Sequence, residues 1–149
     1  MIPVVYASLS HCASVLCPVP AEVAYAFLLD GRQLGTWALG SFDTQPIGDG
    51  IFRGRSLFDD TFTLVRPVGD PTSLRVDYYV GSRPDQLVSR IAAVVVRGVD
   101  IGQPVEVCQV NLLAWRHAGM DDERWLRLVR AHEVEVLLIQ ARLKLQQGT

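Results

Sequence analysis

A histidine near the centre of an apolar helix face is the residue of this chain best placed to do chemistry. Residues 121–146 form one predicted helix, with acids in its first turn and Lys144 near its end. At about 100° per residue, His132 falls within an apolar arc of this helix. The rest of the arc is Trp125, Val129, Val136, Ile139 and Leu143. This face must pack against something apolar, so His132 is expected to point into the interior.

The role of His132 has two interpretations. An imidazole exchanges a proton near neutral pH without a large pKa shift, which suits acid–base catalysis or a hydrogen bond to a ligand. The alternative is a neutral core histidine, satisfied by a strand hydroxyl or carbonyl. Glu133 and Glu135 fall off the apolar arc, and the sequence predicts that both face solvent.

Tyr78 is the second candidate for chemistry. Leu74, Val76 and Val80 share its phase in a predicted strand, so Tyr78 is expected to face the interior while Tyr79 faces out. A phenol that points into a cavity can orient a carbonyl or hydroxyl of a ligand. The alternative is simple packing, with the hydroxyl satisfied by the protein.

The elements that would position these residues are mostly strands. The chain has 149 residues, of which 49% are hydrophobic and 20% charged, and this predicts one compact domain over residues 1–149. Turn signals separate six β-rich runs between the N-terminal segment and the last helix. The runs are 41–45, 51–58, 61–66, 73–80, 91–97 and 105–117. With a first strand that ends near Cys17, they predict a seven-stranded antiparallel sheet.

The stretch of residues 14–37 carries the most specific pattern. A short apolar strand meets two prolines, and a helix opens at about Pro20 with Glu22 in its first turn. Asp30 and Gly31 stop this helix, and a second short turn then brings Trp37 onto the core.

This opening resembles that of the START-like superfamily of helix-grip domains, which includes polyketide cyclases/dehydrases and lipid-transfer domains. The matching residues are Pro18, Pro20, Glu22, Val23, Phe27, Leu29, Asp30 and Trp37. The resemblance implies an α+β fold of order β-α-α-β6-α, in which a curved seven-stranded antiparallel sheet wraps around the long C-terminal helix. It also implies a ligand cavity between sheet and helix.

The resemblance also implies a phase for the last strand, because family members place an aromatic near its end on the concave face. Trp115 fits this position, and counting back by two turns Gln109 and Asn111 inward. In the opposite phase, the more apolar set of Cys108, Val110, Leu112 and Ala114 would face the core. By the same analogy the first strand sends His11 outward. The residues expected inward from that strand are Ser10, Cys12, Ser14 and Leu16.

These expectations define a predicted site in the cavity between sheet and helix. His132 and Tyr78 are the predicted catalytic residues, should the protein be an enzyme. The predicted ligand-binding residues are Trp37, Gln109, Asn111, Trp115, Trp125, Val129 and Val136. We expect the ligand to be a hydrophobic, partly oxygenated small molecule, aromatic, polyketide or lipid-like. The alternative is a cofactor-free cyclase, dehydratase or lyase that acts on such a molecule by acid–base catalysis.

Several other classes lack their motifs. The chain has no glycine-rich phosphate loop, GxSxG elbow, HExxH or Rossmann fingerprint, so we expect no cofactor. Its three cysteines show no CxxC spacing, so we expect no metal. A net charge of −2 without a basic aromatic patch argues against nucleic acid.

Location and assembly are also open to prediction. No apolar stretch approaches the roughly 20 residues of a membrane span, and residues 1–17 lack the positive start of a secretory signal. We therefore expect a cytoplasmic protein without membrane insertion. The apolar second face of the last strand would suit a homodimer.

Overall fold

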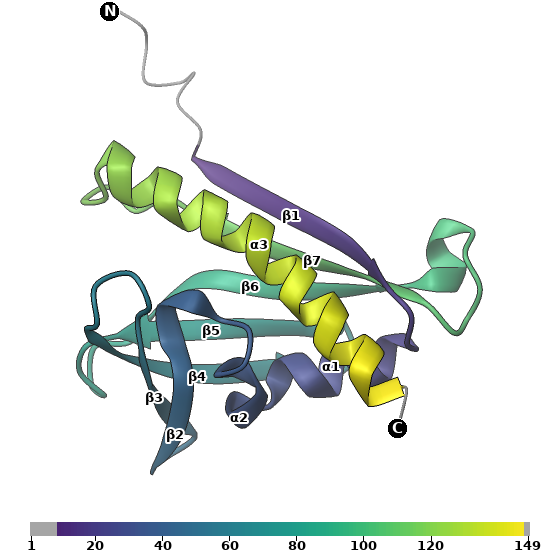
Figure 1. The fold of residues 1–149 in the computed structure, drawn as a ribbon, viewed down its shortest axis with the longest axis horizontal. Helices are drawn as coiled ribbons and strands as arrows, with labels where there is room; N and C mark the ends of the chain where they lie inside the picture. The colour runs from purple at the N-terminus through teal and green to yellow at the C-terminus, as the bar shows by residue number, and fades with distance from the viewer. Residues whose placement is uncertain (1–8, 148–149) are drawn as a thin grey trace, which may run out of the picture.

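The computed structural model describes residues 9–147 and contains seven strands and three α-helices (Figure 1). The predicted domain also includes residues 1–8 and 148–149, which lie outside the described residues. The N-terminal elements are β1 (Ser10–Cys17), α1 (Ala21–Leu29) and α2 (Gly31–Leu34). The remaining elements are β2 (Phe42–Gly48), β3 (Ile51–Arg55), β4 (Phe62–Asp70), β5 (Arg75–Gly81), β6 (Val88–Arg97), β7 (Cys108–Trp115) and α3 (Asp122–Gln147). Short 3-10 helices, η2 (Leu39–Ser41) and η3 (Gly98–Ile101), precede β2 and follow β6.

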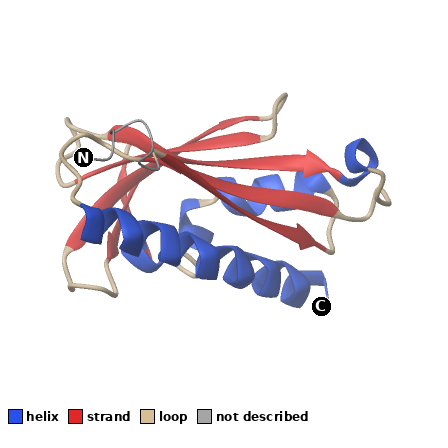
Figure 2. Ribbon diagram, turned by 90° about the horizontal axis from the view of Figure 1, so that it is seen from above, coloured by secondary structure: helices blue, strands red, loops and turns tan. Residues whose placement is uncertain are grey.

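The strands form one antiparallel sheet of order β1-β7-β6-β5-β4-β3-β2. This confirms the predicted fold class, a curved seven-stranded sheet with a long C-terminal helix in the order β-α-α-β6-α. Figure 2 shows the strands as one layer with α1 and α3 on the same side of it. The other side of the sheet carries no helix among the described residues.

Local sequence signals explain where the first helices start and stop. Pro20 is the N-cap of α1, and Glu22 in its first turn forms an ion pair with Arg97 at the end of β6. Asp30 then caps α2, because its side chain accepts a hydrogen bond from the Arg32 backbone N–H at 3.0 Å. The two caps fix the chain direction that delivers Trp37 to the core, where it is buried as predicted.

The main hydrophobic core lies between the sheet, α1 and the C-terminal half of α3. Val136, Ile139 and Leu143 of α3 belong to the same buried cluster as Val110 and Leu112 of β7. This half of the helix therefore packs directly on the sheet.

The predicted inward phase of β7 is wrong. Cys108, Val110, Leu112 and Ala114 are buried toward the helices, so Gln109, Asn111 and Trp115 lie on the opposite face of the strand, where they stay half-buried. The apolar set of an alternating strand occupies the core because burial of that face fixes the register. Asn111 makes hydrogen bonds to the neighbouring strands: its Oδ1 accepts a hydrogen bond from Ser14 Oγ of β1 at 2.7 Å, and its amide donates to the Val94 carbonyl of β6 at 3.0 Å.

The predicted phase of β1 is wrong for the same reason. Cys12, Ser14 and Leu16 are exposed, whereas Ala13 and Cys17 are buried on the helix side. His11 shares the phase of the buried residues and is partly buried, so it does not face outward.

Candidate functional site

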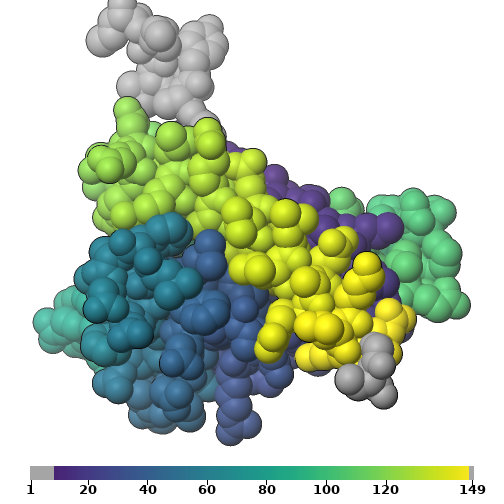
Figure 3. All heavy atoms as spheres, in the orientation of Figure 1, coloured from purple at the N-terminus to yellow at the C-terminus, as the bar shows by residue number. Residues whose placement is uncertain are grey.

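A cavity of about 390 Å³ opens between the N-terminal half of α3, the segment from α2 to η2, the loop between β3 and β4, and strands β4 to β6. Apolar side chains that include Leu34, Val65, Val80 and Leu128 form part of its wall. Figure 3 shows the N-terminal half of α3 beside the surface formed by the β2–β4 region. The volume is in the range of small-molecule sites, roughly 300 to 1,000 Å³.

His132 lines this cavity, as predicted from its place on the helix arc. Its side chain is only 2% exposed, and its Nδ1 has no hydrogen-bond partner among residues 9–147. Burial, with a smaller contribution from His11, lowers the pKa of His132 to about 4. The imidazole is therefore neutral at pH 7.

Glu135 was expected in solvent, and this expectation is wrong. Its side chain is only 5% exposed and lines the cavity. The segment that carries η2 covers this flank of α3, and the backbone N–H of Leu39 donates to Glu135 Oε2 at 2.7 Å. Burial outweighs this hydrogen bond and raises the pKa of Glu135 to about 8, so the carboxyl group is mostly protonated at pH 7.

His132 and Glu135 form a buried pair one helical turn apart. Nε2 of His132 lies 3.7 Å from Oε1 of Glu135. Their environments move the two pKa values in opposite directions, which leaves a neutral base beside a protonated acid. The sequence held a signal for this pair, because residues three apart share a helix face.

Tyr78 faces the interior as predicted and lines the cavity beside Trp37. The two rings meet edge to face, with centroids 5.9 Å apart. The Tyr78 hydroxyl donates to the Leu28 carbonyl of α1 at 2.6 Å, and burial followed by the charge of Glu135 raises its pKa well above 10. The phenol is thus anchored to α1, whereas the buried Nε1 of Trp37 has no hydrogen-bond partner among the described residues.

The other predicted ligand-binding residues lie outside the cavity wall. Val136 belongs to the main core, and Trp125 packs in a small cluster with Ala114 and Met120, against which Val129 also packs. Gln109, Asn111 and Trp115 are on the far face of β7. Of the predicted site residues, Trp37, Tyr78 and His132 line this cavity together, and the others do not line it.

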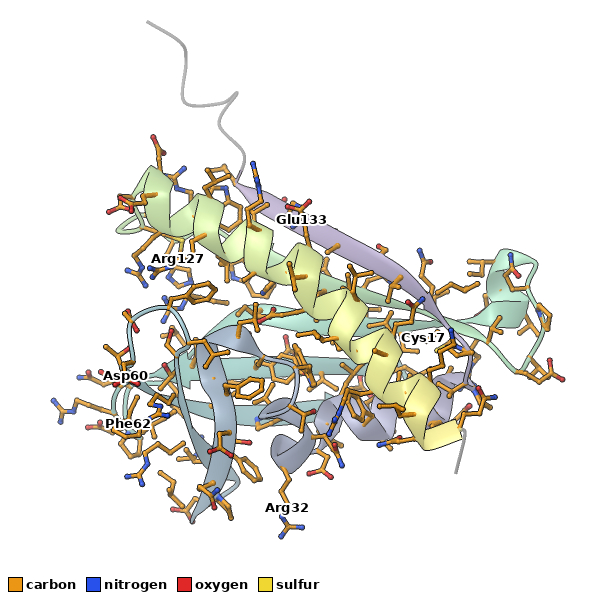
Figure 4. The ribbon with its side chains drawn as sticks, viewed as in Figure 1. Cys17, Arg32, Asp60, Phe62, Arg127 and Glu133 are labelled. Carbon is orange, nitrogen blue, oxygen red and sulfur yellow. The ribbon has the colours of Figure 1, made fainter. Side chains whose placement is uncertain are left out.

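Three arginines that the sequence analysis did not single out also line the cavity, namely Arg90, Arg124 and Arg127. The guanidinium of Arg127 lies over the ring of Phe58, 5.1 Å from its centroid. Figure 4 shows Arg127 between α3 and the β3–β4 loop, whereas Glu133 is on the other side of the helix. Glu133 is exposed, as predicted.

The described residues give three further findings about metal binding, thiols and membrane spans. No group of three histidine, cysteine or acidic side chains within residues 9–147 is arranged to hold a metal ion. Cys17 and Cys108 are free thiols in the core, and burial raises their pKa values to about 12 and about 11. Over the same residues, no helix has the length and apolar character needed to cross a membrane.

Comparisons with known proteins find relatives by structure. No family model and no curated protein matches the sequence. The aromatase/cyclase ZhuI from Streptomyces sp. R1128 is similar with a TM-score of 0.63 and 15% identity, over 91% of this chain and 93% of that one. The di-domain aromatase/cyclase BexL of the BE-7585A biosynthetic pathway is similar with a TM-score of 0.67 and 16% identity, over 95% of this chain and 48% of BexL. Aha1 from Colwellia psychrerythraea, described as a dimer, is similar with a TM-score of 0.65 and 13% identity, over 91% of this chain and 96% of Aha1.

Identities this low show a shared fold and leave the activity of this chain open. The similarity covers nearly all of the sheet and its helix, and so agrees with the resemblance seen in residues 14–37. This chain therefore has the helix-grip fold of the polyketide cyclase-like proteins.

Proposed function

We propose that this protein binds a hydrophobic, partly oxygenated small molecule, aromatic, polyketide or lipid-like, in the cavity between sheet and α3. The observation that carries the proposal is a cavity of small-molecule size whose wall combines apolar side chains with polar ones. Trp37 and His132 each bring a buried nitrogen without a partner among the described residues. An unsatisfied buried polar group costs about 1 to 3 kcal/mol, so an oxygenated ligand that bonds to these nitrogens would gain affinity.

Fluorescence titration with N-phenyl-1-naphthylamine, a neutral apolar dye, tests this proposal. We expect a Kd near 1 to 10 μM, about −7 to −8 kcal/mol, because the cavity can remove the dye from water. Leu128 already lines the cavity and is half-buried, so Leu128→Trp should fill the space and weaken binding at least about tenfold. Unchanged dye affinity in folded Leu128→Trp protein would contradict binding in this cavity.

A second candidate function is a cofactor-free cyclase, dehydratase or lyase, and the His132–Glu135 pair favours it. Neutral His132 can remove a proton next to a carbonyl, while the Glu135 carboxyl gives its proton to a β-hydroxyl that leaves as water. In this elimination a C–H and a C–O bond break and a C=C bond forms. The proton taken by His132 then returns to the Glu135 carboxylate 3.7 Å away, which restores the pair.

The dehydration of 4-hydroxy-4-phenylbutan-2-one tests this second candidate, because its conjugated product absorbs in the near ultraviolet. Glu135→Gln and His132→Phe should each reduce the rate at least about 100-fold. Glu133→Gln is the matched control, since Glu133 is an exposed carboxylate two residues from Glu135. Equal rates in all three variants would argue for a protein that only binds its ligand.

The homodimer expected from the sequence stays a prediction. The far face of β7 carries the half-buried side chains of Leu113 and Trp115, which no helix of the described residues covers. Light scattering of the purified chain would measure its mass, and a monomer at high micromolar concentration would contradict the dimer.

A further inference from the structure

Arg90 occupies an irregular position in β6. Tyr78 of β5 pairs with Ile91, and the next residue, Tyr79, pairs with Ser89. Arg90 is therefore an extra residue in β6, opposite no residue of β5. Such a bulge turns a side chain away from the regular alternation of a strand, and bulges are frequent next to active sites.

The bulge changes which residues reach the cavity. With regular alternation Arg90 and Ile91 would face opposite sides of the sheet. In the structure both line the cavity, and Arg90 is only partly exposed. Its Nε is buried and has no hydrogen-bond partner among residues 9–147.

Two arginines of α3 face the same cavity. Arg124 and Arg127 are three residues apart, hence on one side of the helix, and both line the space. Arg124 and Arg90 are close enough that the charge of Arg124 adds to the effect of burial in lowering the pKa of Arg90. Like charges repel, so this arrangement is unfavourable while the cavity holds no anion.

The two acids that line the cavity offset only part of this positive charge. Hydrogen bonds from Thr61 and, less strongly, the charge of Arg127 lower the pKa of Asp59, whereas Glu135 is mostly protonated at pH 7 and accepts a hydrogen bond from the Leu39 backbone N–H. Within the described residues, no ion pair involves the side chain of Arg90 or of Arg124. An excess of positive charge therefore remains along one side of the cavity.

We infer that the ligand of this cavity is an organic anion, whose apolar body fills the space near Trp37 and Tyr78 and whose carboxylate or similar oxyanion group is held by Arg90, Arg124 and Arg127. This inference rests on the proposed ligand binding and adds the charge of the ligand. Guanidinium groups match the geometry of oxyanions and bind them through charge-assisted hydrogen bonds. An anion would also relieve the repulsion between Arg90 and Arg124 and give Nε of Arg90 a partner.

Two dyes with the same apolar skeleton test the charge directly. 8-Anilino-1-naphthalenesulfonate carries a sulfonate, and N-phenyl-1-naphthylamine is its neutral counterpart. Arg90→Gln and Arg124→Gln should each weaken binding of the sulfonate dye at least about tenfold and that of the neutral dye less than about twofold. Arg142→Gln, an exposed position of α3 outside the cavity wall, should change neither affinity.

The outcomes separate the two proposals. If the arginine variants weaken binding of both dyes equally, or of neither, the anion inference is overturned. The proposed ligand binding still holds in that case if Leu128→Trp blocks dye binding. A wild-type protein that binds neither dye would overturn both. If Arg90→Gln fails to fold, Arg124→Gln decides alone, because Arg124 is exposed and its loss leaves the core intact.

Competition against the sulfonate dye then tests whether the anion belongs to an organic molecule. Displacement by 2-naphthoate at concentrations where 2-naphthalenemethanol and inorganic phosphate have no effect is the expected result. Displacement by phosphate alone would mean an inorganic anion site and would overturn the inference.

Discussion

The two halves of α3 lie along the same sheet but make different contacts with it. The C-terminal half places Val136, Ile139 and Leu143 in the main hydrophobic core, in one buried cluster with Val110 and Leu112 of β7. The N-terminal half borders a cavity of about 390 Å³ and brings Leu128 and His132 to its wall, and Glu135 joins them at the middle of the helix. One helix thus anchors the fold with one half and leaves room for a ligand with the other, so stability and function can be changed separately.

The largest effect is expected in the packed half. Ile139 is fully buried, so Ile139→Ala should lower the free energy of unfolding by about 3 to 4 kcal/mol. Leu128→Ala, a truncation in the half that already borders a cavity, should cost less than about 1.5 kcal/mol, because Leu128 is only half-buried. Urea unfolding of both variants measures the difference. Equal losses would remove the contrast between the halves.

A second effect should come from the buried pair and depend on pH. The folded state keeps the Glu135 proton up to about pH 8, since the pKa is raised from 4.5, and keeps His132 neutral down to about pH 4, since the pKa is lowered from 6.5. Between pH 4.5 and 6.5 folded and unfolded chains bind one proton each, so the pair leaves stability unchanged. From pH 6.5 to 8 only the folded chain keeps a proton, so stability should fall by about 2 kcal/mol.

Glu135→Gln isolates this contribution. Without the carboxyl group, stability should rise with pH up to about 6.5, where unfolded His132 loses its proton, and stay level above it. Urea unfolding at several pH values compares the two proteins, and the difference between them removes the shared titrations. Parallel profiles from pH 6.5 to 8 would show that Glu135 titrates normally.

A third, smaller effect concerns His132 itself. Its ring makes no hydrogen bond within the described residues, so His132→Phe deprives no protein group of a partner and should keep or raise the melting temperature. Ligand affinity should fall about tenfold, the equivalent of one hydrogen bond near 1.4 kcal/mol. A destabilised variant whose folded fraction binds dye normally would remove His132 from the site.

Much of the fold could be predicted because its signals are local. Turn residues separate the strands, and the arc through His132 and Ile139 marks the inner face of α3. Tyr78 was found by simple alternation within a regular strand, and its position is confirmed.

The residues that the sequence analysis misplaced or missed have two kinds of cause, non-local contacts or strand irregularities in some cases and a mistaken analogy in others. Glu135 is buried because a segment nearly a hundred positions earlier, at Leu39, folds over the flank of α3. Arg90 reaches the cavity through a bulge, and a bulge breaks the alternation on which strand predictions rest. Gln109 and Asn111 were predicted to face inward because Trp115 was matched to an aromatic residue that family members place on the concave face. The apolar set of β7 already favoured the opposite phase.

The smallest effect is expected for Asn111, on the face of β7 that points away from α3. It tests whether this face of the sheet takes any part in ligand binding. Asn111 bonds to Ser14 and to the Val94 carbonyl on the side of β7 away from α3, so Asn111→Ala should lower stability by about 1 kcal/mol. Dye affinity should stay within about twofold of wild type, because no atom of Asn111 lines the cavity. Thermal unfolding and dye titration of this one variant measure both quantities. A tenfold loss of affinity with normal stability would mean that β7 presents its amides to the ligand, and the cavity would then have to lie against β7 and not beneath the N-terminal half of α3.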